Sequence, residues 1–227
     1  MSGLKTYFGV LAAIAVIGVW LISIILLMNW EIRFDNPLIY IMVLVQMHLY
    51  TGLFITAHDA MHGTVSRNRT LNDIIGQVCT FLYACFPFKK LYTKHHEHHN
   101  HVHTEKDPDY HDGSFLMWYF KFIREYISWW QIVLMAIIFN ILKLWIAEEN
   151  LLMFWVLPSL LSTLQLFYFG TWVPHHGEHE NKYQSRTLAR NHFYAFITCY
   201  FFGYHYEHHD SPGTPWWKLW KLKEANP

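Results

Sequence analysis

The sequence contains few charged residues and few cysteines. Lysine, arginine, aspartate and glutamate together make up 15% of its 227 residues, whereas an ordinary soluble domain has about a quarter. The 17 basic and 17 acidic side chains cancel, so the net charge does not favour binding to nucleic acid. The three cysteines, Cys79, Cys85 and Cys199, form no C-x-x-C pair and stand in apolar surroundings. We therefore expect unpaired packing cysteines, with no disulfide framework, zinc ribbon or iron–sulfur site.

Apolar residues, 53% of the chain, are instead gathered into four long blocks. A helix of about 20 residues covers roughly 30 Å, the thickness of the hydrocarbon layer of a membrane. The first block is too long for the apolar core of a signal peptide, and no A-x-A-like cleavage site closes it. The sequence predicts an all-α, polytopic membrane protein with four transmembrane helices, forming one domain over residues 1–227. The expected spans are Phe8–Met28, Pro37–Ala57, Ile127–Ala147 and Leu151–Val173.

Two shorter apolar stretches are broken by polar residues. Leu71–Phe88 is interrupted by Asn72, Asp73 and Gly76, and Phe115–Tyr126 mixes aromatic with charged side chains. Both are too short or too polar for a confident span, and segments of this kind lie in the membrane interface or re-enter it. We expect two such interfacial helices.

The positions of lysine and arginine orient the predicted spans. They fall mostly within Arg67–Arg124, Lys182–Arg190 and Lys218–Lys223, whereas the two short loops on the other side are mainly acidic. Basic residues accumulate on the cytoplasmic side of membrane proteins. Four spans then place both termini and both large polar segments in the cytoplasm, where these segments would form a histidine-rich cap.

Histidine is in large excess, with 17 residues in the chain. An H-x-x-x-H pair stands where the second span reaches the cytoplasm. Two H-x-x-H-H boxes, and one histidine just past the fourth span, lie on the same predicted side. Residues three and four apart share one face of a helix, so the imidazoles of each motif can point at one place. The candidate metal ligands are His58, His62, His95, His98, His99, His175, His205, His208 and His209.

Nine imidazoles are more than one metal ion needs, and they suit two ions, each with about four or five ligands and an open position. A structural zinc site would take four ligands and close, whereas redox chemistry needs open positions. Iron is the usual metal for O₂ activation at nitrogen-rich sites. We expect a non-haem di-iron centre with O₂ as co-substrate, and zinc as the main rival.

A metal transporter or metal sensor is the non-enzymatic alternative. The run HHEHHNHVH at residues 95–103 resembles a tract that collects metal ions. The other clusters, however, are regularly spaced and lie at helix ends. The predicted spans also lack a chain of acidic or histidine residues crossing the bilayer, so the enzymatic interpretation is preferred.

Carboxylates that follow the H-x-x-H-H box at residues 95–99 could support the ligands. Asp107, Asp109 and His111 follow that box, and with His101 they are candidates for orienting ligand imidazoles through N–H···O bonds. The alternative is a simple Asp-Pro turn. The remaining histidines are expected on the surface or behind the ligands: His96, His103, His176, His179 and His192.

His48 stands in the middle of the second span, where an ionisable residue is a candidate for function. It could bond to a neighbouring helix at Asn140 or Gln165. The other interpretation places it under the metal site, where it would support a ligand or shape the closed end of a substrate tunnel.

Longer stretches around these boxes resemble a known family. They are FITAHDAMHG at residues 54–63, TEKDPDYH at 104–111, LQLFYFGT at 164–171 and FGYHYEHH at 202–209. These stretches resemble the bacterial and cyanobacterial β-carotene ketolases, within the membrane fatty-acid desaturase and hydroxylase superfamily. The resemblance runs from about Gly52 to Trp217 and carries the ligand role onto the nine histidines named above.

This resemblance implies O₂-dependent oxidation of the C4 methylene of a β-ionone ring to a ketone, through two hydroxylations and loss of water. The substrate would be a lipid-soluble carotenoid, taking β-carotene to echinenone and canthaxanthin, or zeaxanthin towards astaxanthin. A fatty-acyl or sterol desaturase or hydroxylase using the same boxes is the alternative.

A redox enzyme of this kind needs electrons from elsewhere. The chain has no dinucleotide fingerprint and no recognisable haem or iron–sulfur motif. We expect an external electron donor such as an acidic ferredoxin, docked on the cytoplasmic basic residues. A long apolar tunnel would hold the substrate, with these aromatic residues as candidate walls: Trp129, Trp130, Phe154, Trp155, Phe167, Tyr168 and Phe169.

Overall fold

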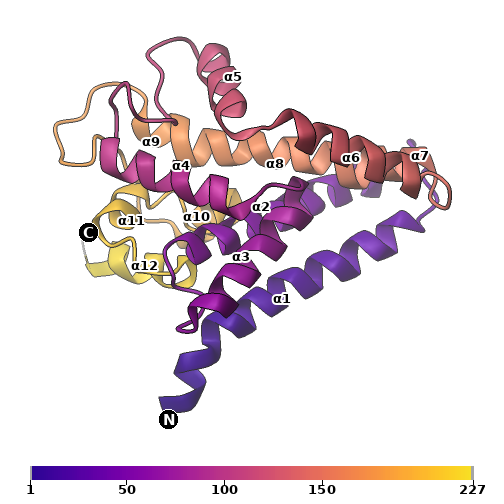
Figure 1. The fold of residues 1–227 in the computed structure, drawn as a ribbon, viewed down its shortest axis with the longest axis horizontal. Helices are drawn as coiled ribbons and strands as arrows, with labels where there is room; N and C mark the ends of the chain where they lie inside the picture. Colours follow the sequence, from indigo (N-terminus) through magenta and orange to yellow (C-terminus); the bar gives the residue numbers. More distant parts are fainter. Residues whose placement is uncertain (1, 226–227) are drawn as a thin grey trace.

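The computed structural model describes residues 2–225, with the side chains of residues 2–6 left out, and the chain is helical with no strand in that range (Figure 1). The all-α prediction is therefore confirmed. The helices in chain order are α1 Ser2–Met28, α2 Leu38–Met61, α3 Arg69–Ala84, α4 Phe88–His101, α5 Phe115–Tyr126, α6 Trp129–Leu142, α7 Glu148–Leu151, η1 Leu152–Val156, α8 Leu157–Phe167, η2 Tyr168–Trp172, α9 Val173–His175, α10 His192–Cys199, α11 His205–Asp210 and α12 Trp216–Ala225.

Three of these helical segments are long and apolar enough to cross a membrane: Tyr7–Met28, Leu38–Met61 and Glu148–His175. They confirm the first, second and fourth predicted spans. The third prediction, a straight span over Ile127–Ala147, needs correction. Helix α6 ends at Leu142 and covers about 21 Å at 1.5 Å per residue. It qualifies as a fourth span only together with α5, from which it is bent by 83°.

The bend between α5 and α6 has an identifiable cause. The ammonium group of Lys90 donates to the backbone oxygens of Tyr126 (2.8 Å) and Ile127 (3.0 Å), and to the Ser128 hydroxyl (3.2 Å). Helix C-termini leave carbonyl groups without partners, and a cation satisfies them well. The Gln131 side chain then donates to the backbone oxygen of Ala84 (2.5 Å), which joins α6 to the end of α3. Hydrogen bonds therefore fix the bend at the point where α3, α4, α5 and α6 meet.

The last long span is one helix with two wider π turns, η1 and η2. Each π turn is followed by a proline, Pro158 after η1 and Pro174 after η2. Proline has no N–H and its ring collides with the carbonyl four residues earlier, which here belongs to Phe154 or Gly170. A π turn widens the helix at that carbonyl, so the span continues through both prolines. The second π turn lies directly before the candidate ligand His175.

Polar side chains join the spans inside the apolar layer. The Thr51 hydroxyl lies 2.8 Å from the Ser162 hydroxyl and donates to the Gln165 side chain (2.5 Å), whose amide nitrogen donates to the backbone oxygen of Thr198 (2.6 Å). These bonds connect α2, α8 and α10. Buried polar groups that are fully paired fix one arrangement of helices.

His48 is not part of this network, and the expected bond to Asn140 or Gln165 is wrong. Asn140 bonds within its own helix, to the backbone oxygen of Ala136. The His48 ring stacks on Tyr200, with ring centres 4.4 Å apart, and neither ring nitrogen has a partner among the described residues. His48 is a packed aromatic ring at the contact between α2 and α10.

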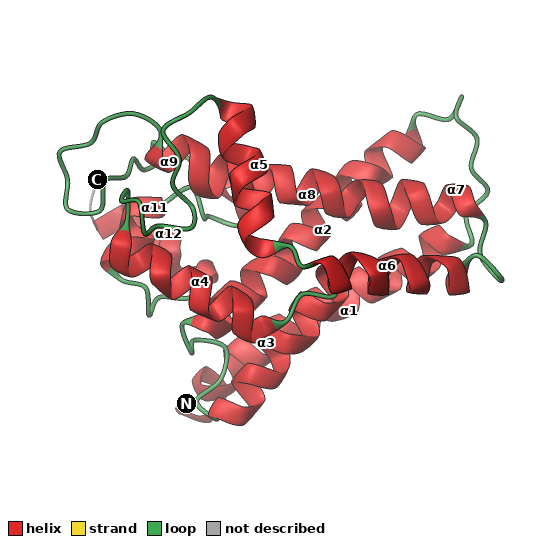
Figure 2. Ribbon diagram, turned by 45° about the horizontal axis from the view of Figure 1, so that its top comes forward, coloured by secondary structure: helices red, strands yellow, loops and turns green. Residues whose placement is uncertain are grey.

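The helices that carry the histidine boxes gather at one end of the molecule, and α7 lies at the other (Figure 2). At the α7 end, Asn150 donates to the backbone oxygens of Leu27 and Trp30, both at 2.7 Å. At the histidine end, the start of α1 contacts the C-terminal region, where the rings of Phe8 and Trp217 lie 5.5 Å apart. The three cysteines are buried and unpaired, as predicted.

Candidate metal centre

Each candidate ligand lies in a helix or at the end of one. His58 lies in the last turn of α2 and His62 caps that helix. Gly63, at φ 69°, then takes the left-handed conformation in which glycine is favoured, and ends the helix. The other two boxes lie within α4 and α11, and His175 ends α9.

The structure brings all nine candidate ligands together in two groups. Within each group the ligand-capable atoms lie within 4.8 Å of one another. The five-histidine group contains His58, His62, His95, His99 and His208. The four-histidine group contains His98, His175, His205 and His209.

Each H-x-x-H-H box is divided between the two groups, which the spacing alone did not reveal. In α4 the first and last histidines, His95 and His99, join the five-histidine group, and His98 joins the other. In α11 the assignment is reversed, because His205 and His209 join the four-histidine group and His208 the five-histidine group. The two boxes therefore cross between the groups, and the rings of His99 and His209 stack at 4.3 Å where they meet.

The Nε2 atoms face one another inside each group. His62 and His95 have their Nε2 atoms 2.7 Å apart, and His99 and His208 have theirs 3.1 Å apart. In the four-histidine group the Nε2 pairs stand at 2.8 Å (His175, His205), 2.9 Å (His205, His209) and 3.2 Å (His98, His209). Metal–nitrogen bonds of about 2.1 Å at right angles would separate neighbouring nitrogens by about 3.0 Å. The spacing of the donor atoms therefore fits a metal ion in each group.

Two ligand candidates are bonded from behind through Nδ1. His98 Nδ1 lies 2.9 Å from Asp107 Oδ1, and His175 Nδ1 lies 2.9 Å from the backbone oxygen of Gln184. Asp107 is itself held by the backbone N–H groups of His103 and Asp109. A proton on Nδ1 leaves the Nε2 lone pair free to point inward, as metal-binding histidines require.

Burial keeps most of these imidazoles neutral, the form that binds metal. Burial, with repulsion from His96, lowers the pKa of His62 to about 3. Burial and the surrounding histidines lower the pKa of His99 to about 2, and they hold the pKa of His208 well below its usual range. His98 differs, because the carboxylates of Asp109 and Asp107 outweigh the opposing effect of burial and raise its pKa.

Of the five residues expected to support the ligands, only the two aspartates lie beside one. Asp107 and Asp109 lie beside His98, with Asp109 Oδ2 3.9 Å from its Nδ1. His48, His101 and His111 do not reach the ligands: His48 packs on Tyr200, His101 is exposed, and His111 accepts from the backbone N–H of Gly113. Among the remaining histidines, His192 bonds to Tyr204 and Glu224, away from both groups.

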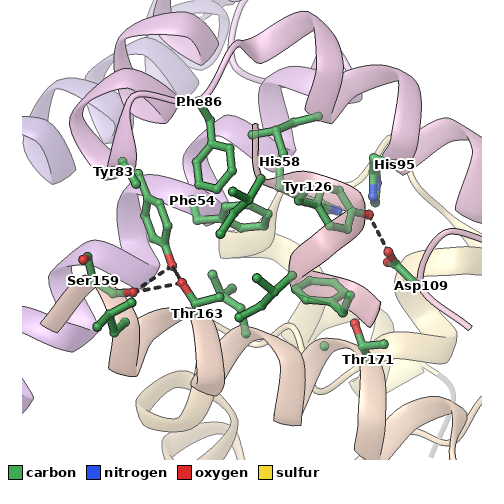
Figure 3. Close-up of a pocket in the computed structure, with 18 of the residues that line it drawn as sticks. Phe54, His58, Tyr83, Phe86, His95, Asp109, Tyr126, Ser159, Thr163 and Thr171 are labelled. Carbon is green, nitrogen blue, oxygen red and sulfur yellow. Dashed lines mark hydrogen bonds between the residues drawn. The ribbon is translucent and has the colours of Figure 1, made fainter. Parts of the chain in front are cut away.

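An apolar cavity runs from the histidines to the membrane-facing surface (Figure 3). Its inner end is formed by His58, His95, His98 and His205. Ile132 of α6 and Leu160 of α8, which are 56% and 57% exposed, also line it. Those exposed apolar side chains belong to membrane-facing helices, so the cavity opens sideways between α6 and α8.

The predicted tunnel walls are wrong in detail. None of the seven aromatic residues proposed from the sequence lines this cavity. Phe154 and Phe167 are fully buried in packing between helices, and Trp129 is largely exposed. The cavity walls contain other aromatic residues instead: Phe54, Tyr83, Phe86, Phe122, Tyr126 and Phe202. Aromatic content identifies a span, but it does not tell which side of the helix faces a cavity.

Sequence reasoning also missed the polar residues of the cavity other than the histidines and Asp109, among them Tyr126 and Thr171 at the histidine end. Tyr126 ends α5 and bonds to Asp109, and Thr171 lies in the π turn η2. Tyr126 ends the predicted interfacial stretch Phe115–Tyr126, and Thr171 ends the family-like stretch at residues 164–171. The only available signal was the position of Thr171 four residues before His175, which places both on one side of a helix.

Comparison with known proteins gives the family. The model of the family described as fatty acid desaturase matches residues 35–146 and 114–226. A β-carotene 4-ketolase of Protosiphon botryoides is 46% identical over 75% of this chain and 48% of its own length. A zeaxanthin 4-ketolase of Chlamydomonas reinhardtii is 44% identical over 78% of this chain and 42% of its own length. A β-carotene ketolase of a Paracoccus strain is 41% identical over 75% of this chain and 73% of its own length.

The chain spans about half the length of the first two of these relatives. No solved structure matches it. The family model covers most of the chain, and the Paracoccus relative is covered over nearly three quarters of its length. The chain therefore belongs to the fatty acid desaturase family, in which it groups with the β-carotene ketolases.

Proposed function

We propose that the protein is a carotenoid 4-ketolase, which oxidises the C4 methylene of a β-ionone ring to a ketone with O₂. The observation that carries the proposal is the apolar cavity, which opens between membrane-facing helices and ends at histidines of both groups. A substrate dissolved in the bilayer can enter such a cavity without crossing water. The names of the relatives, β-carotene and zeaxanthin 4-ketolase, identify the kind of substrate that fits.

Two iron ions are proposed as the metal, one in each histidine group. Iron held by imidazoles, with positions left open, supplies the capacity to activate O₂. The five-histidine group would hold one ion through His58, His62, His95, His99 and His208, and the four-histidine group would hold the other through His98, His175, His205 and His209.

The overall reaction balances as two oxidations at one carbon. In the first, a C4–H bond becomes C4–OH, while O₂ takes up two electrons and two protons from outside and releases one water. The second converts the remaining C4–H bond in the same way and gives a geminal diol, which loses water to leave the ketone. The C4–H bond is allylic and therefore weak. The cavity walls hold the ring with C4 at the histidine end and exclude bulk water there.

Electrons are proposed to come from a separate acidic donor such as a ferredoxin. The cleft beside His62 and His96 carries Arg67, Arg69 and Lys89. A positive cleft next to a ligand suits an acidic partner. This proposal assumes that the histidine end of the molecule lies in the cytoplasm.

Pigment analysis tests the function directly. Expressed in cells that accumulate β-carotene, the chain should produce carotenoids with one and then two keto groups, separable in one chromatogram. Replacing His58, His98 or His208 by Ala should abolish the product, whereas His192→Ala, outside both groups, should retain most of it. Purified protein should bind about two iron ions per chain. Ketone formation by protein that holds a single zinc ion and no iron would contradict the metal assignment.

A further inference from the structure

The cavity is apolar along most of its wall and carries two groups of polar residues. Tyr83, Ser159 and Thr163 bond to one another, and the second group stands at the histidine end. Tyr126, Asp109 and Thr171 line the cavity beside His98 and His205. Figure 3 shows the Tyr126 hydroxyl turned to Asp109, with Thr171 at the same end of the cavity. Asp109 is accounted for by its place beside His98. A site that only had to bind a hydrocarbon ring would not need the accessible oxygens of Tyr126 and Thr171. Their position next to the candidate ligands indicates a polar atom in the substrate.

Tyr126 presents a hydrogen-bond acceptor to the cavity. Its hydroxyl donates to the Asp109 carboxylate, which leaves lone pairs of the phenol oxygen free. The residue is rigidly held, because Lys90 binds its backbone oxygen at 2.8 Å. Asp109 is fixed as well, since its backbone N–H donates to Asp107 (2.8 Å) and its backbone oxygen accepts from Trp118 (2.5 Å). The acceptor is thus positioned before any substrate enters.

Thr171 presents a hydroxyl without a partner. The helical threonines Thr56 and Thr163 each donate to the carbonyl four residues earlier, at 2.8 and 3.0 Å. Thr171 lies in the π turn η2, and its hydroxyl makes no hydrogen bond among the described residues. Its side chain is 4% exposed and lines the cavity. A hydroxyl that is accessible from the cavity and has no protein partner is suited to bind a ligand.

We infer that Tyr126 and Thr171 bind the hydroxyl group that the first oxidation places on C4. The inference rests on the proposed function and deepens it. A new hydroxyl in an apolar cavity is unfavourable without a partner, and an unbound alcohol would return to the membrane after one oxidation. Held between the Tyr126 oxygen and the Thr171 hydroxyl, the alcohol stays in the cavity until its remaining C4–H bond is oxidised. These two residues therefore favour ketone over alcohol as the released product.

The test compares product ratios in variants that remove single oxygen atoms. Tyr126→Phe and Thr171→Val keep the volume of the side chain, and Thr171→Ser keeps the hydroxyl. Tyr119→Phe on the same helix and Thr198→Val on α10 are matched controls, because neither residue lines the cavity. Each variant is assayed in membranes with β-carotene and, separately, with a 4-hydroxylated carotenoid, and its iron content per folded chain is measured.

The expected result is a rise in the ratio of 4-hydroxy to 4-keto product, on the order of fivefold in Tyr126→Phe and in Thr171→Val. The KM for the 4-hydroxylated substrate should rise in both variants, while their iron content stays close to wild type. Thr171→Ser and the two controls should keep the product ratio of the wild type. An unchanged ratio in both variants would overturn the inference. So would an equal fall of both oxidations, which indicates a purely structural role. A wild-type chain that makes no ketone overturns the proposed function and this inference with it.

Discussion

At the scale of single residues, the metal centre depends on what holds each imidazole from behind. Asp107 accepts three N–H groups at once: those of His98 Nδ1 and the Asp109 backbone on Oδ1, and that of the His103 backbone on Oδ2. Such a carboxylate fixes the ring plane and the tautomer of the ligand, and its charge strengthens the imidazole as a donor. The hydrogen bond from His98, together with its positive charge, lowers the pKa of Asp107 against the opposing effect of burial.

Asp107→Asn should weaken iron binding without unfolding the protein. An amide has one oxygen and therefore cannot accept all three N–H groups, and it carries no charge. Loss of such a supporting group typically costs roughly 10–100-fold in metal affinity. The measurement is iron retained per chain during titration with a chelator. Asp112→Asn is the matched control, because Asp112 is exposed and pairs with His111, which belongs to neither histidine group. Equal iron retention in both variants would show that Asp107 has no such role.

His48 leads to the opposite expectation. Its ring stacks on Tyr200, and its nitrogens bond to none of the described residues. The ring therefore stabilises the fold by packing and not by hydrogen bonding. His48→Phe preserves a flat ring of similar size and should keep the folded yield, iron content and product ratio of the wild type. His48→Ala removes the stacked contact and should lower the thermal stability in detergent. A loss of iron or a shift toward alcohol in His48→Phe would instead assign a function to the imidazole nitrogens.

The spacing of histidines predicted which residues come together, but not how they divide. The i, i+3 and i+4 rule places three imidazoles on one helix face, which is a local property of the chain. The division of His95, His98 and His99 between two groups depends on how α4 meets α11, which is a tertiary contact. The supporting carboxylates of Asp107 and Asp109 could be suspected from their proximity in sequence. The backbone oxygen of Gln184 could not, because any residue offers a carbonyl group.

At the scale of elements, the bend between α5 and α6 shapes the cavity. Tyr126 ends α5 and Gln131 lies in the first turn of α6, and both line the cavity. The bend is held by Lys90 from α4, whose ammonium reaches three oxygens across it. The sequence showed an interfacial stretch followed by an apolar one. It did not show that a lysine 36 residues earlier joins them.

Lys90→Met should loosen this bend. It leaves two carbonyl groups and one hydroxyl without their charged donor, which costs about 1–3 kcal/mol of unfolding free energy. The neighbouring Lys89 is exposed and donates no bond across the bend, so Lys89→Met is the control. Thermal unfolding in detergent and limited proteolysis between α5 and α6 measure the effect. If the two variants unfold alike, the bend is maintained by packing of its apolar residues and not by the lysine.

The π turns show what local sequence reasoning can and cannot reach. Pro158 and Pro174 are visible in the sequence, and proline inside a helix usually predicts a break. The structure keeps one span through both, because each is preceded by a wider turn. That widening also turns Thr171 into the cavity instead of toward its own helix backbone. The prolines show where the helix must be irregular. Packing against the neighbouring helices decides whether it breaks or widens into a π turn.

At the scale of the whole molecule, the ligands come from four separate segments that meet only at one end. Helices α2, α4, α9 and α11 each contribute, and α12 secures that end from outside. Asp59, next to His58, accepts from the backbone N–H of Trp216 (3.0 Å), and Glu207, within the last box, pairs with Lys223 (3.1 Å). Asp59 and Glu207 therefore attach the C-terminal helix and leave the imidazoles free for metal.

The same arrangement constrains the orientation in the membrane, which gives the last prediction. The start of α1 contacts Trp217 at the histidine end, and the Asn150 side chain bonds the α1–α2 loop at the other. Lys143, near that far end, is paired with Glu148 at 2.6 Å and so adds little net charge. Arg67, Arg69 and Lys89 stand at the histidine end and should keep it in the cytoplasm.

Reporter fusions then have definite outcomes. Fusions after Lys106 and at the C-terminus should report the cytoplasm, and a fusion after Glu149 should report the opposite side. An external signal at Lys106 together with a cytoplasmic one at Glu149 would invert the molecule and exclude a cytoplasmic electron donor. Signals on opposite sides for Lys106 and the C-terminus would contradict the metal centre as well as the orientation. His95, His98 and His99 could then not meet His205, His208 and His209, and the two-metal arrangement itself would fail.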